Sequence, residues 1–203
     1  VELFKKIKES LDNGIPARKL EYSKEEEILL RSFGLLSLKP VIYVANIKEE
    51  DLINGNKYID LVKEHALNNN SECVVMCAKI ESELSELNAD DKESFLKELG
   101  IEESGLDKLI KATYKLLGLA TYFTVGSDEV RAWTYKVGMK APECAGIIHT
   151  DFERGFIRAE VMSYEDLITY GSELKVKEAG KIRLEGKEYM MKDGDICHFR
   201  FNV

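Results

Sequence analysis

The side chains best able to bind a small ligand stand directly after two apolar runs of the sequence. An amide, a carboxylate and an ammonium group occur within two short segments, which are Asn46, Ile47 and Glu49 after the first run and Cys77, Ala78 and Lys79 at the end of the second. If the runs form neighbouring parallel strands, the two segments meet at one sheet edge, where open α/β sheets bind ligands. The alternative is that Asn46 and Glu49 only cap the following turn, as Asn often does after a strand.

The elements around these segments are predicted to form a strand–helix–strand unit. The runs at 39–46 and 73–78 are apolar almost throughout, which is typical of strands buried on both faces of a parallel sheet. A helical pattern at about 57–67 connects them, and such crossovers are nearly always right-handed. On a strand, Cys73 and Cys77 would stand ~13 Å apart, too far for a shared metal, so we expect both to be buried structural thiols.

A second group of polar residues lies in the carboxy-terminal half. His149, Asp151 and Arg154 stand close together, but neither a nucleophile nor a metal partner accompanies them, so we expect structural roles. Several cations and one tryptophan could form an RNA-binding surface. These residues are Arg131, Trp133, Arg154, Arg158, Lys181 and Arg183. The alternative is that Trp133 belongs to the core and the cations only solvate strand faces.

Helical signals dominate the first 118 residues. Apolar residues four apart over 3–11 predict an amphipathic helix that needs a partner for its apolar face, and the sequence leaves open whether that partner belongs to this chain. Ser23 and Glu26 form a capping-box pattern for a helix that ends at Gly34. A further helix is predicted over 104–117, and we expect it to join two domains.

From Leu119 onward the hydrophobic period changes to two. The segments 120–125 and 130–137 flank a Gly-Ser-Asp-Glu turn and predict a hairpin, and a last strand follows the Asp193-Gly194 turn. A short helix is predicted after Ser163. This order indicates a small mixed sheet with a helix over one face, which is an α+β architecture.

Composition limits the class of protein. The 203 residues are 44% apolar and carry a formal net charge of −8, so the chain is not a nucleic-acid binder by bulk charge. No run approaches the roughly 18 apolar residues of a membrane span. Four cysteines fit a reducing compartment, and we interpret the protein as cytoplasmic. Because Val1 and not Met comes first, we expect the natural amino terminus to lie upstream.

Two segments resemble nucleotide motifs of GTPases. The segment 39–49 is similar to the fourth motif, which takes the form Asn-x-x-Glu in the YchF family of Obg-type P-loop ATPases, and 77–81 is similar to the fifth, Ser-Ala-Lys. Four later blocks resemble the carboxy-terminal TGS domain of the same family, and they are 121–124, 129–134, 148–160 and 193–203. The resemblance covers nearly the whole chain.

The resemblance implies that the intact protein binds ATP, alongside or above GTP, with Mg²⁺. In GTPases an Asp carboxylate accepts paired hydrogen bonds from guanine, whereas Glu49 is one methylene longer. Ile47 replaces the Lys whose stem packs along the base, and Lys48 stands where a small residue is usual and could draw Glu49 aside. The implied base-binding residues are Asn46, Ile47, Glu49, Cys77, Ala78 and Lys79.

The implied fold is an α/β remnant of a P-loop GTPase-type domain, a strand–helix–strand unit plus helices, followed by an α+β β-grasp TGS domain. Its expected parts are the end of a helical hairpin at 1–23, the carboxy-terminal half of the nucleotide domain at 24–118 and the TGS domain at 119–203. The phosphate-binding motif Gly-x-x-x-x-Gly-Lys-Ser/Thr and the motif Asp-x-x-Gly do not occur in the sequence, so neither catalytic residues nor Mg²⁺ ligands are assigned.

The resemblance implies that the intact protein hydrolyses ATP and associates with the ribosome or RNA. We expect this chain alone to be inactive as a hydrolase. It is also expected to self-associate through the unpaired edge of the strand at 41–45, unless the opening helices cover that edge. The rival hypothesis is a stand-alone β-grasp interaction or RNA-binding module without nucleotide affinity.

Overall fold

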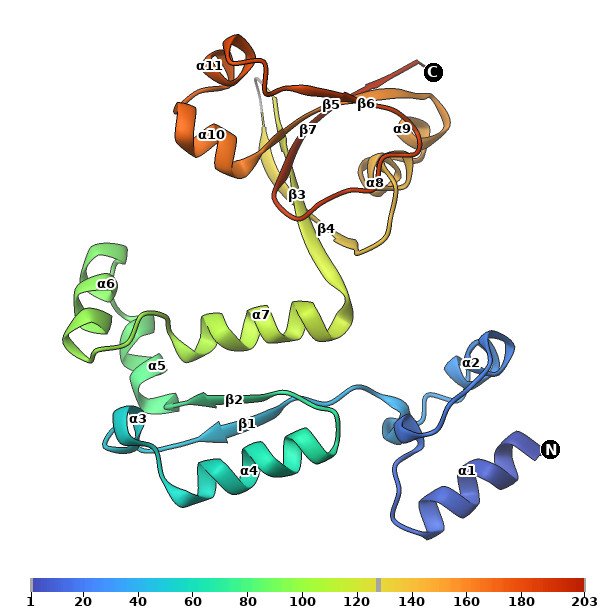
Figure 1. Ribbon diagram of the computed structural model, residues 1–203, viewed down its shortest axis with the longest axis vertical. Helices are drawn as coiled ribbons and strands as arrows, with labels where there is room; N and C mark the ends of the chain where they lie inside the picture. The colour runs from blue at the N-terminus through green and yellow to red at the C-terminus, as the bar shows by residue number, and fades with distance from the viewer. Residues whose placement is uncertain (1, 127–128, 203) are drawn as a thin grey trace. The chain divides into compact units, whose positions relative to one another are not determined.

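The computed structural model describes residues 2–126 and 129–202, which form two compact units, Val1–Leu116 and Leu117–Val203 (Figure 1). Each unit has its own hydrophobic clusters. Ser127 and Asp128 of the predicted hairpin turn, and Val203 of the predicted last strand, lie outside the described residues. No helix among the described residues is long and apolar enough to cross a membrane.

The first unit begins with short helices that pack on one another. They are α1 (Glu2–Asp12), the 3-10 turn η1 (Ala17–Lys19), α2 (Lys24–Arg31) and the 3-10 turn η2 (Leu36–Leu38). Ile7 of α1 is buried against Ala17 and Leu30, so part of the helix's apolar face finds its partner within this chain. The predicted capping box is present, since Glu26 N donates to Ser23 Oγ and Ser23 N donates to the Glu26 carboxylate.

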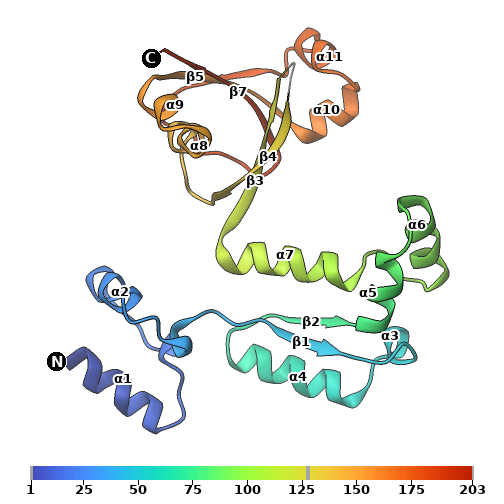
Figure 2. The same ribbon diagram turned by 180° about the vertical axis from the view of Figure 1, so that it is seen from behind.

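A two-stranded parallel sheet follows, with a helix on each side (Figures 1 and 2). Strand β1 (Tyr43–Asn46) pairs with β2 (Cys73–Met76), and α4 (Lys57–Asn68) connects them, after the short α3 (Asp51–Asn54). This confirms the strand–helix–strand prediction. Among the described residues β1 pairs only with β2.

The prediction that both strands are buried on both faces is wrong for β1. Val44, in its middle, is 44% exposed, whereas Val74 opposite it on β2 is 7% exposed. The physical reason is that a sheet of two strands is too narrow for the described residues to cover every side chain of β1. Self-association through this edge stays a prediction.

Three further helices complete the first unit. They are α5 (Ala78–Ser85), α6 (Ala89–Glu98) and α7 (Gly105–Leu117). Ile80 and Leu84 of α5 are buried against Phe95 and its neighbours on α6, which holds these two helices together. The predicted helix 104–117 is confirmed, with Ser104 as its cap.

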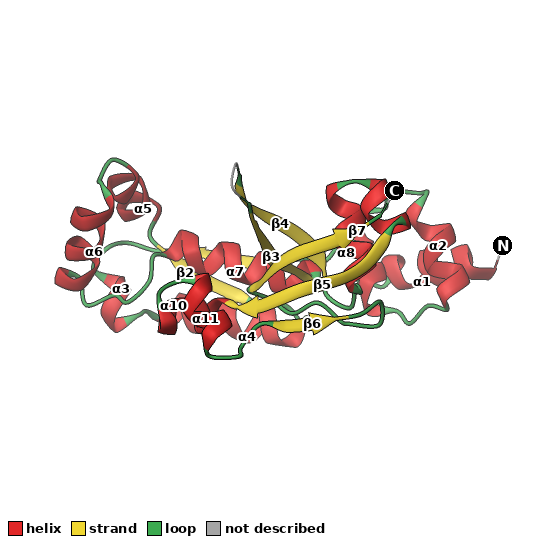
Figure 3. Ribbon diagram, turned by 90° about the horizontal axis from the view of Figure 1, so that it is seen from above, coloured by secondary structure: helices red, strands yellow, loops and turns green. Residues whose placement is uncertain are grey.

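The second unit is built on a five-stranded sheet in the order β4-β3-β7-β5-β6 (Figure 3). The β3–β7 pair is parallel and all other pairs are antiparallel. The strands are β3 (Leu119–Val125), β4 (Val130–Lys136), β5 (Phe156–Ser163), β6 (Arg183–Glu185) and β7 (Asp195–Phe201). The predicted hairpin is therefore present as β3 and β4, and the mixed sheet is confirmed.

Helices cover both faces of this sheet, and not one face as predicted. Helices α8 (Ala141–Ile148) and α9 (Thr150–Arg154) belong to one face, while α10 (Tyr164–Tyr170) and α11 (Glu173–Glu178) belong to the other. The reason is that successive residues of a strand point to opposite faces and both are apolar here. Ile196 is buried with Val176 of α11, whereas its neighbour Cys197 is buried with Cys144 of α8. The helix predicted after Ser163 is α10, which Ser163 caps.

Candidate functional site

The two polar segments singled out in the sequence meet at the carboxyl ends of β1 and β2. The backbone N–H of Ala78 donates to Asn46 Oδ1 at 3.0 Å, although the residues are 32 positions apart. Ile47 N donates to the Met76 carbonyl at 2.9 Å, which continues the ladder past the end of β1. Asn46 therefore reaches across to the next strand end and does not merely cap its own turn.

Glu49 and Lys79 form an ion pair across the same edge. Lys79 Nζ donates to Glu49 Oε2 at 3.3 Å, and Glu83 Oε1 lies 3.7 Å from the same nitrogen. The hydrogen bond from Lys79 to Glu49 raises the pKa of Lys79. Both side chains are more than half exposed, at 70% and 52%, so the pair is worth little stability but leaves both groups open to a ligand.

Lys48 does not draw Glu49 aside as the sequence suggested it could. Its ammonium lies 3.5 Å from Glu50 Oε1, on the next residue along the loop. Ile47 is half-buried, whereas Asn46 and Ala78 are exposed. The loop therefore presents an amide, an apolar side chain and a paired carboxylate side by side.

Cys77 differs from the other residues of this set because its side chain points into the core. It is 3% exposed and packs with Ile80 and Leu84, as expected for a structural thiol, whereas Cys73 is half-buried. Only the backbone of Cys77 is thus positioned to face a ligand. A hollow of about 680 Å³ adjoins the first loop and is lined by Asn46 and Ile47, together with the start of α4.

Glu81 and Gly105 connect the second segment to the start of α7, and sequence reasoning assigned neither of them to the site. The carboxylate of Glu81 accepts hydrogen bonds from Gly105 N at 2.7 Å and Leu106 N at 3.2 Å, at the start of α7. No local signal predicts this contact, because Glu81 and Gly105 are 24 positions apart. A glycine near the start of the predicted helix 104–117 is the available hint, since glycine is a poor helix former.

In the second unit, His149 has the structural role expected for it. It is the cap of α9, where Asp151 N donates to His149 Nδ1 at 3.2 Å. Arg154 lies exposed in the last turn of the same helix. No group of three or more potential metal ligands occurs among the described residues.

The candidate RNA-binding cations do not all share one environment. The Arg131 guanidinium lies 4.1 Å from the centre of the Trp133 ring, and Arg158 lies 3.9 Å from Glu160. Trp133 is half-buried and packs against the core cluster, which agrees with the alternative that it belongs to the core. Lys181 is exposed in the loop before β6. Glu160 also accepts two hydrogen bonds from Arg200, which lower the pKa of this carboxyl.

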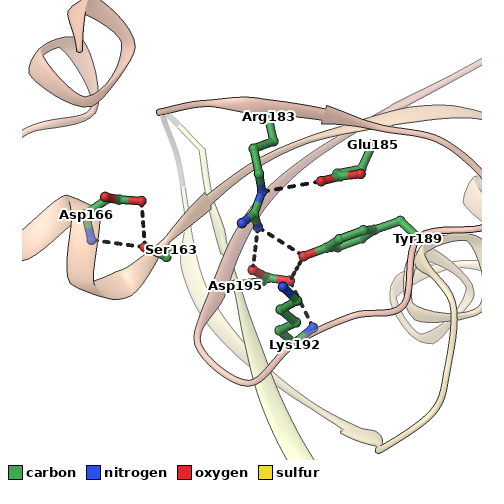
Figure 4. Close-up of polar contacts among 7 residues, drawn as sticks. All are labelled: Ser163, Asp166, Arg183, Glu185, Tyr189, Lys192 and Asp195. Carbon is green, nitrogen blue, oxygen red and sulfur yellow. Dashed lines mark hydrogen bonds and ion pairs between the residues drawn. The ribbon is translucent and has the colours of Figure 1, made fainter. Parts of the chain in front are cut away.

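Arg183 differs from the other candidate cations because a polar network ties it to a buried carboxylate, although its own side chain is 40% exposed (Figure 4). Its Nη2 donates to Asp195 Oδ1 at 3.1 Å and to Tyr189 Oη at 3.0 Å. Tyr189 Oη and Lys192 N both donate to Asp195 Oδ2, at 2.8 and 3.0 Å. Since Asp195 is 2% exposed, Arg183 is needed to balance a buried carboxylate.

Comparison with known proteins decides the family. A protein from Bacillus subtilis (strain 168) named "Ribosome-binding ATPase YchF" is 57% identical over 204 residues, which cover 100% of this chain and 56% of the relative. The family profile YchF-GTPase_C, described as a protein of unknown function (DUF933), matches residues 119–202. The chain belongs to the YchF family. It corresponds to the carboxy-terminal part of YchF proteins and spans about half the length of the curated relatives it matches.

The YchF likeness extends to other organisms and to a solved structure. A protein of the same name from Escherichia coli O157:H7 is 49% identical over 201 residues, covering 99% of this chain and 55% of the relative. The structure of the Schizosaccharomyces pombe YchF GTPase superposes with a TM-score of 0.82 at 38% identity, over 98% of this chain and 53% of that one. The fold described above is thus shared with a solved YchF structure from yeast.

Proposed function

We propose that this chain supplies the base-binding side of the nucleotide site of a YchF-type protein that binds and hydrolyses ATP. The observation that carries the proposal is the hydrogen bond from Ala78 N to Asn46 Oδ1, which joins the two motif segments at one sheet edge. Open α/β sheets bind ligands at this position. The base contacts would come from Asn46, Ile47 and Glu49 on one loop and from the backbone of Cys77, Ala78 and the Lys79 side chain on the other.

The residues at this edge fit a purine base. Ile47 offers an apolar side chain for one face of the ring, while Glu49 and Lys79 offer an acceptor and a donor for its polar edge. The phosphates and Mg²⁺ would be held by the part of the protein that carries the phosphate-binding loop, because the motif for that loop does not occur in these 203 residues. When bound, Mg²⁺ supplies charge stabilisation of the transferred phosphoryl group.

We further propose that the second unit is a β-grasp TGS domain through which the protein associates with the ribosome or RNA in the cytoplasm. The mixed five-stranded sheet supports the fold assignment, and the names of the bacterial relatives support the partner. Arg131, Arg154, Arg158 and Lys181 would carry the RNA contact. The domain assignment proposed for the chain is a helical-hairpin end at 1–23, the nucleotide-domain half at 24–118 and the TGS domain at 119–203.

A second candidate function is an interaction module without nucleotide affinity. The exposed guanidinium of Arg131 over the Trp133 ring favours it, because such a pair can stack on an unpaired base. The first function requires nucleotide affinity and the second lacks it, so a binding measurement distinguishes them. We define the extended protein as a chimera in which these 203 residues replace the matching segment of the Bacillus subtilis relative.

The experiment measures ATP binding by titration calorimetry to the 203-residue chain and to the extended protein. The proposal expects binding by the extended protein that weakens on Asn46→Ala, and no turnover by the 203-residue chain. A matched control is Asn68→Ala, which changes an amide at the far end of α4. If the extended protein does not bind ATP, the proposal is wrong and the interaction module without nucleotide affinity is the function that remains.

A further inference from the structure

Glu81 connects the second motif segment to the helix that leaves the first unit. It lies in the first turn of α5, two residues after Lys79, and its carboxylate accepts the end amides of Gly105 and Leu106 on α7 at 2.7 and 3.2 Å. A carboxylate at a helix amino terminus is stabilised by the unpaired N–H groups and by the helix dipole. This contact therefore holds two helices that are far apart in the sequence in one arrangement.

Helix α7 has another cap, so Glu81 is not needed for capping alone. Asp107 N donates to Ser104 Oγ at 3.1 Å, and Ser104 is 1% exposed. A local Ser at this position is the usual way in which a helix start is stabilised. What Glu81 adds is the connection between α5 and α7.

Gly105 brings α7 directly against the end of β2. A Cβ atom at this position would lie 2.4 Å from Met76 Cβ and 3.1 Å from Met76 Cα, so no larger residue fits without a shift of the backbone. Met76 is the last residue of β2 and immediately precedes Cys77. The start of α7 thus packs on the strand end from which the second motif segment begins.

The first turn of α5 is consequently held from two directions. Asn46 accepts the Ala78 N–H on one side, and Glu81 holds the helix to α7 on the other. We propose that Glu81, together with Gly105, is a positioning residue that keeps the backbone of Ala78 and the side chain of Lys79 in place against the nucleotide base. This inference rests on the proposed function, because it assigns a support to the same site.

The test measures the affinities of the extended protein for ATP and for inorganic tripolyphosphate, before and after Glu81→Gln. The Gln side chain keeps one acceptor for Gly105 N but loses the charge and the second acceptor. We expect the Kd for ATP to rise on the order of tenfold, the scale of a lost charge-assisted hydrogen bond. The Kd for tripolyphosphate should stay unchanged, because this probe has no base and reports only on the phosphate site.

Three further variants make the result specific. Glu86→Gln makes the same chemical change at the other end of α5, where the residue is exposed, and should leave both affinities unchanged. Ser104→Ala removes the local cap of α7 but keeps the Glu81 contact, and it should change ATP affinity less than Glu81→Gln does. Gly105→Ala disturbs the same junction from the other side and should weaken ATP but not tripolyphosphate binding.

Each outcome decides the inference. An equal loss of ATP and tripolyphosphate affinity in Glu81→Gln would mean that the residue only stabilises the fold. Unchanged ATP affinity in both Glu81→Gln and Gly105→Ala would overturn the inference while leaving the proposed function intact. If the extended protein binds tripolyphosphate and ATP equally tightly, the base contributes no affinity, and both the inference and the proposed function are overturned.

Discussion

Nucleotide choice should depend on the length of the side chain at position 49. The resemblance to GTPases implies that a shorter carboxylate here would accept two hydrogen bonds from guanine, and the extra methylene of Glu49 is expected to crowd that arrangement. In the structure one of these oxygens is occupied by Lys79 Nζ at 3.3 Å. We therefore predict that Glu49→Asp, combined with Ile47→Lys, shifts the preference of the extended protein toward GTP.

The size of the shift follows from the contacts. A hydrogen-bonding edge of the base that is left mispaired in the site costs about 1–3 kcal/mol. The Glu49–Lys79 pair that must be broken is mostly exposed, so breaking it offsets little of this cost. A net change of about 1–3 kcal/mol corresponds to a change of roughly 5- to 150-fold in the ratio of the ATP and GTP dissociation constants.

The assay is titration of ATP and GTP into the extended protein and its variants. Glu50→Asp is the matched control, since Glu50 is adjacent and contacts Lys48 at 3.5 Å. The control should keep the wild-type ratio. Identical ratios in the wild type and the Glu49→Asp, Ile47→Lys variant would refute the reasoning and would place discrimination in backbone contacts around Ile47 and Ala78.

Three other predictions concern activity and stability. The 203-residue chain should hydrolyse neither ATP nor GTP, because phosphate and Mg²⁺ contacts supply most of the transition-state stabilisation; phosphate release by a purified sample that survives Asn46→Ala would contradict this. Burial raises the pKa of the Cys144 thiol to about 12, so its contribution to stability is complete below pH ~9 and is lost as pH rises toward the folded pKa. The free energy of unfolding should therefore fall as pH rises from about 9 toward about 12, and Cys144→Ala should reduce that fall. Asp195→Asn should lower the free energy of unfolding, measured by chemical denaturation, by about 2–4 kcal/mol, because it leaves Arg183 without its buried charged partner. The control Glu188→Gln, at a side chain 86% exposed, should leave that free energy unchanged.

Patterns in the sequence predict many helices and strands of both units, because residues close together in the sequence determine where these elements form. The capping box at Ser23, the helix over 104–117 and the hairpin after Leu119 each depend on residues within one or two turns of each other. The meeting of Asn46 with Ala78 is also predictable, since the ends of consecutive parallel strands lie at one edge.

The contacts that sequence reasoning missed join positions far apart in the chain. Glu81 reaches Gly105, and Asp193 accepts the Thr121 N–H at 2.8 Å from 72 positions away. Arg183 looked like a surface cation because its partner Asp195 follows 12 residues later, after a turn. The helices on both faces of the second sheet were missed because α8, α9 and α11 are eight residues long or shorter, which is too short for a clear hydrophobic period.

Placing the adenine ring tests the central claim most directly. The extended protein is irradiated with an azido-adenine analogue of ATP, and the labelled peptides are identified by mass spectrometry, with excess ATP as competitor. We predict ATP-protected labelling within 46–49 or 77–79, the two segments that the Asn46–Ala78 hydrogen bond brings together. Protected labelling confined to other parts of the protein would contradict the account, because the base would then bind away from this edge of the sheet.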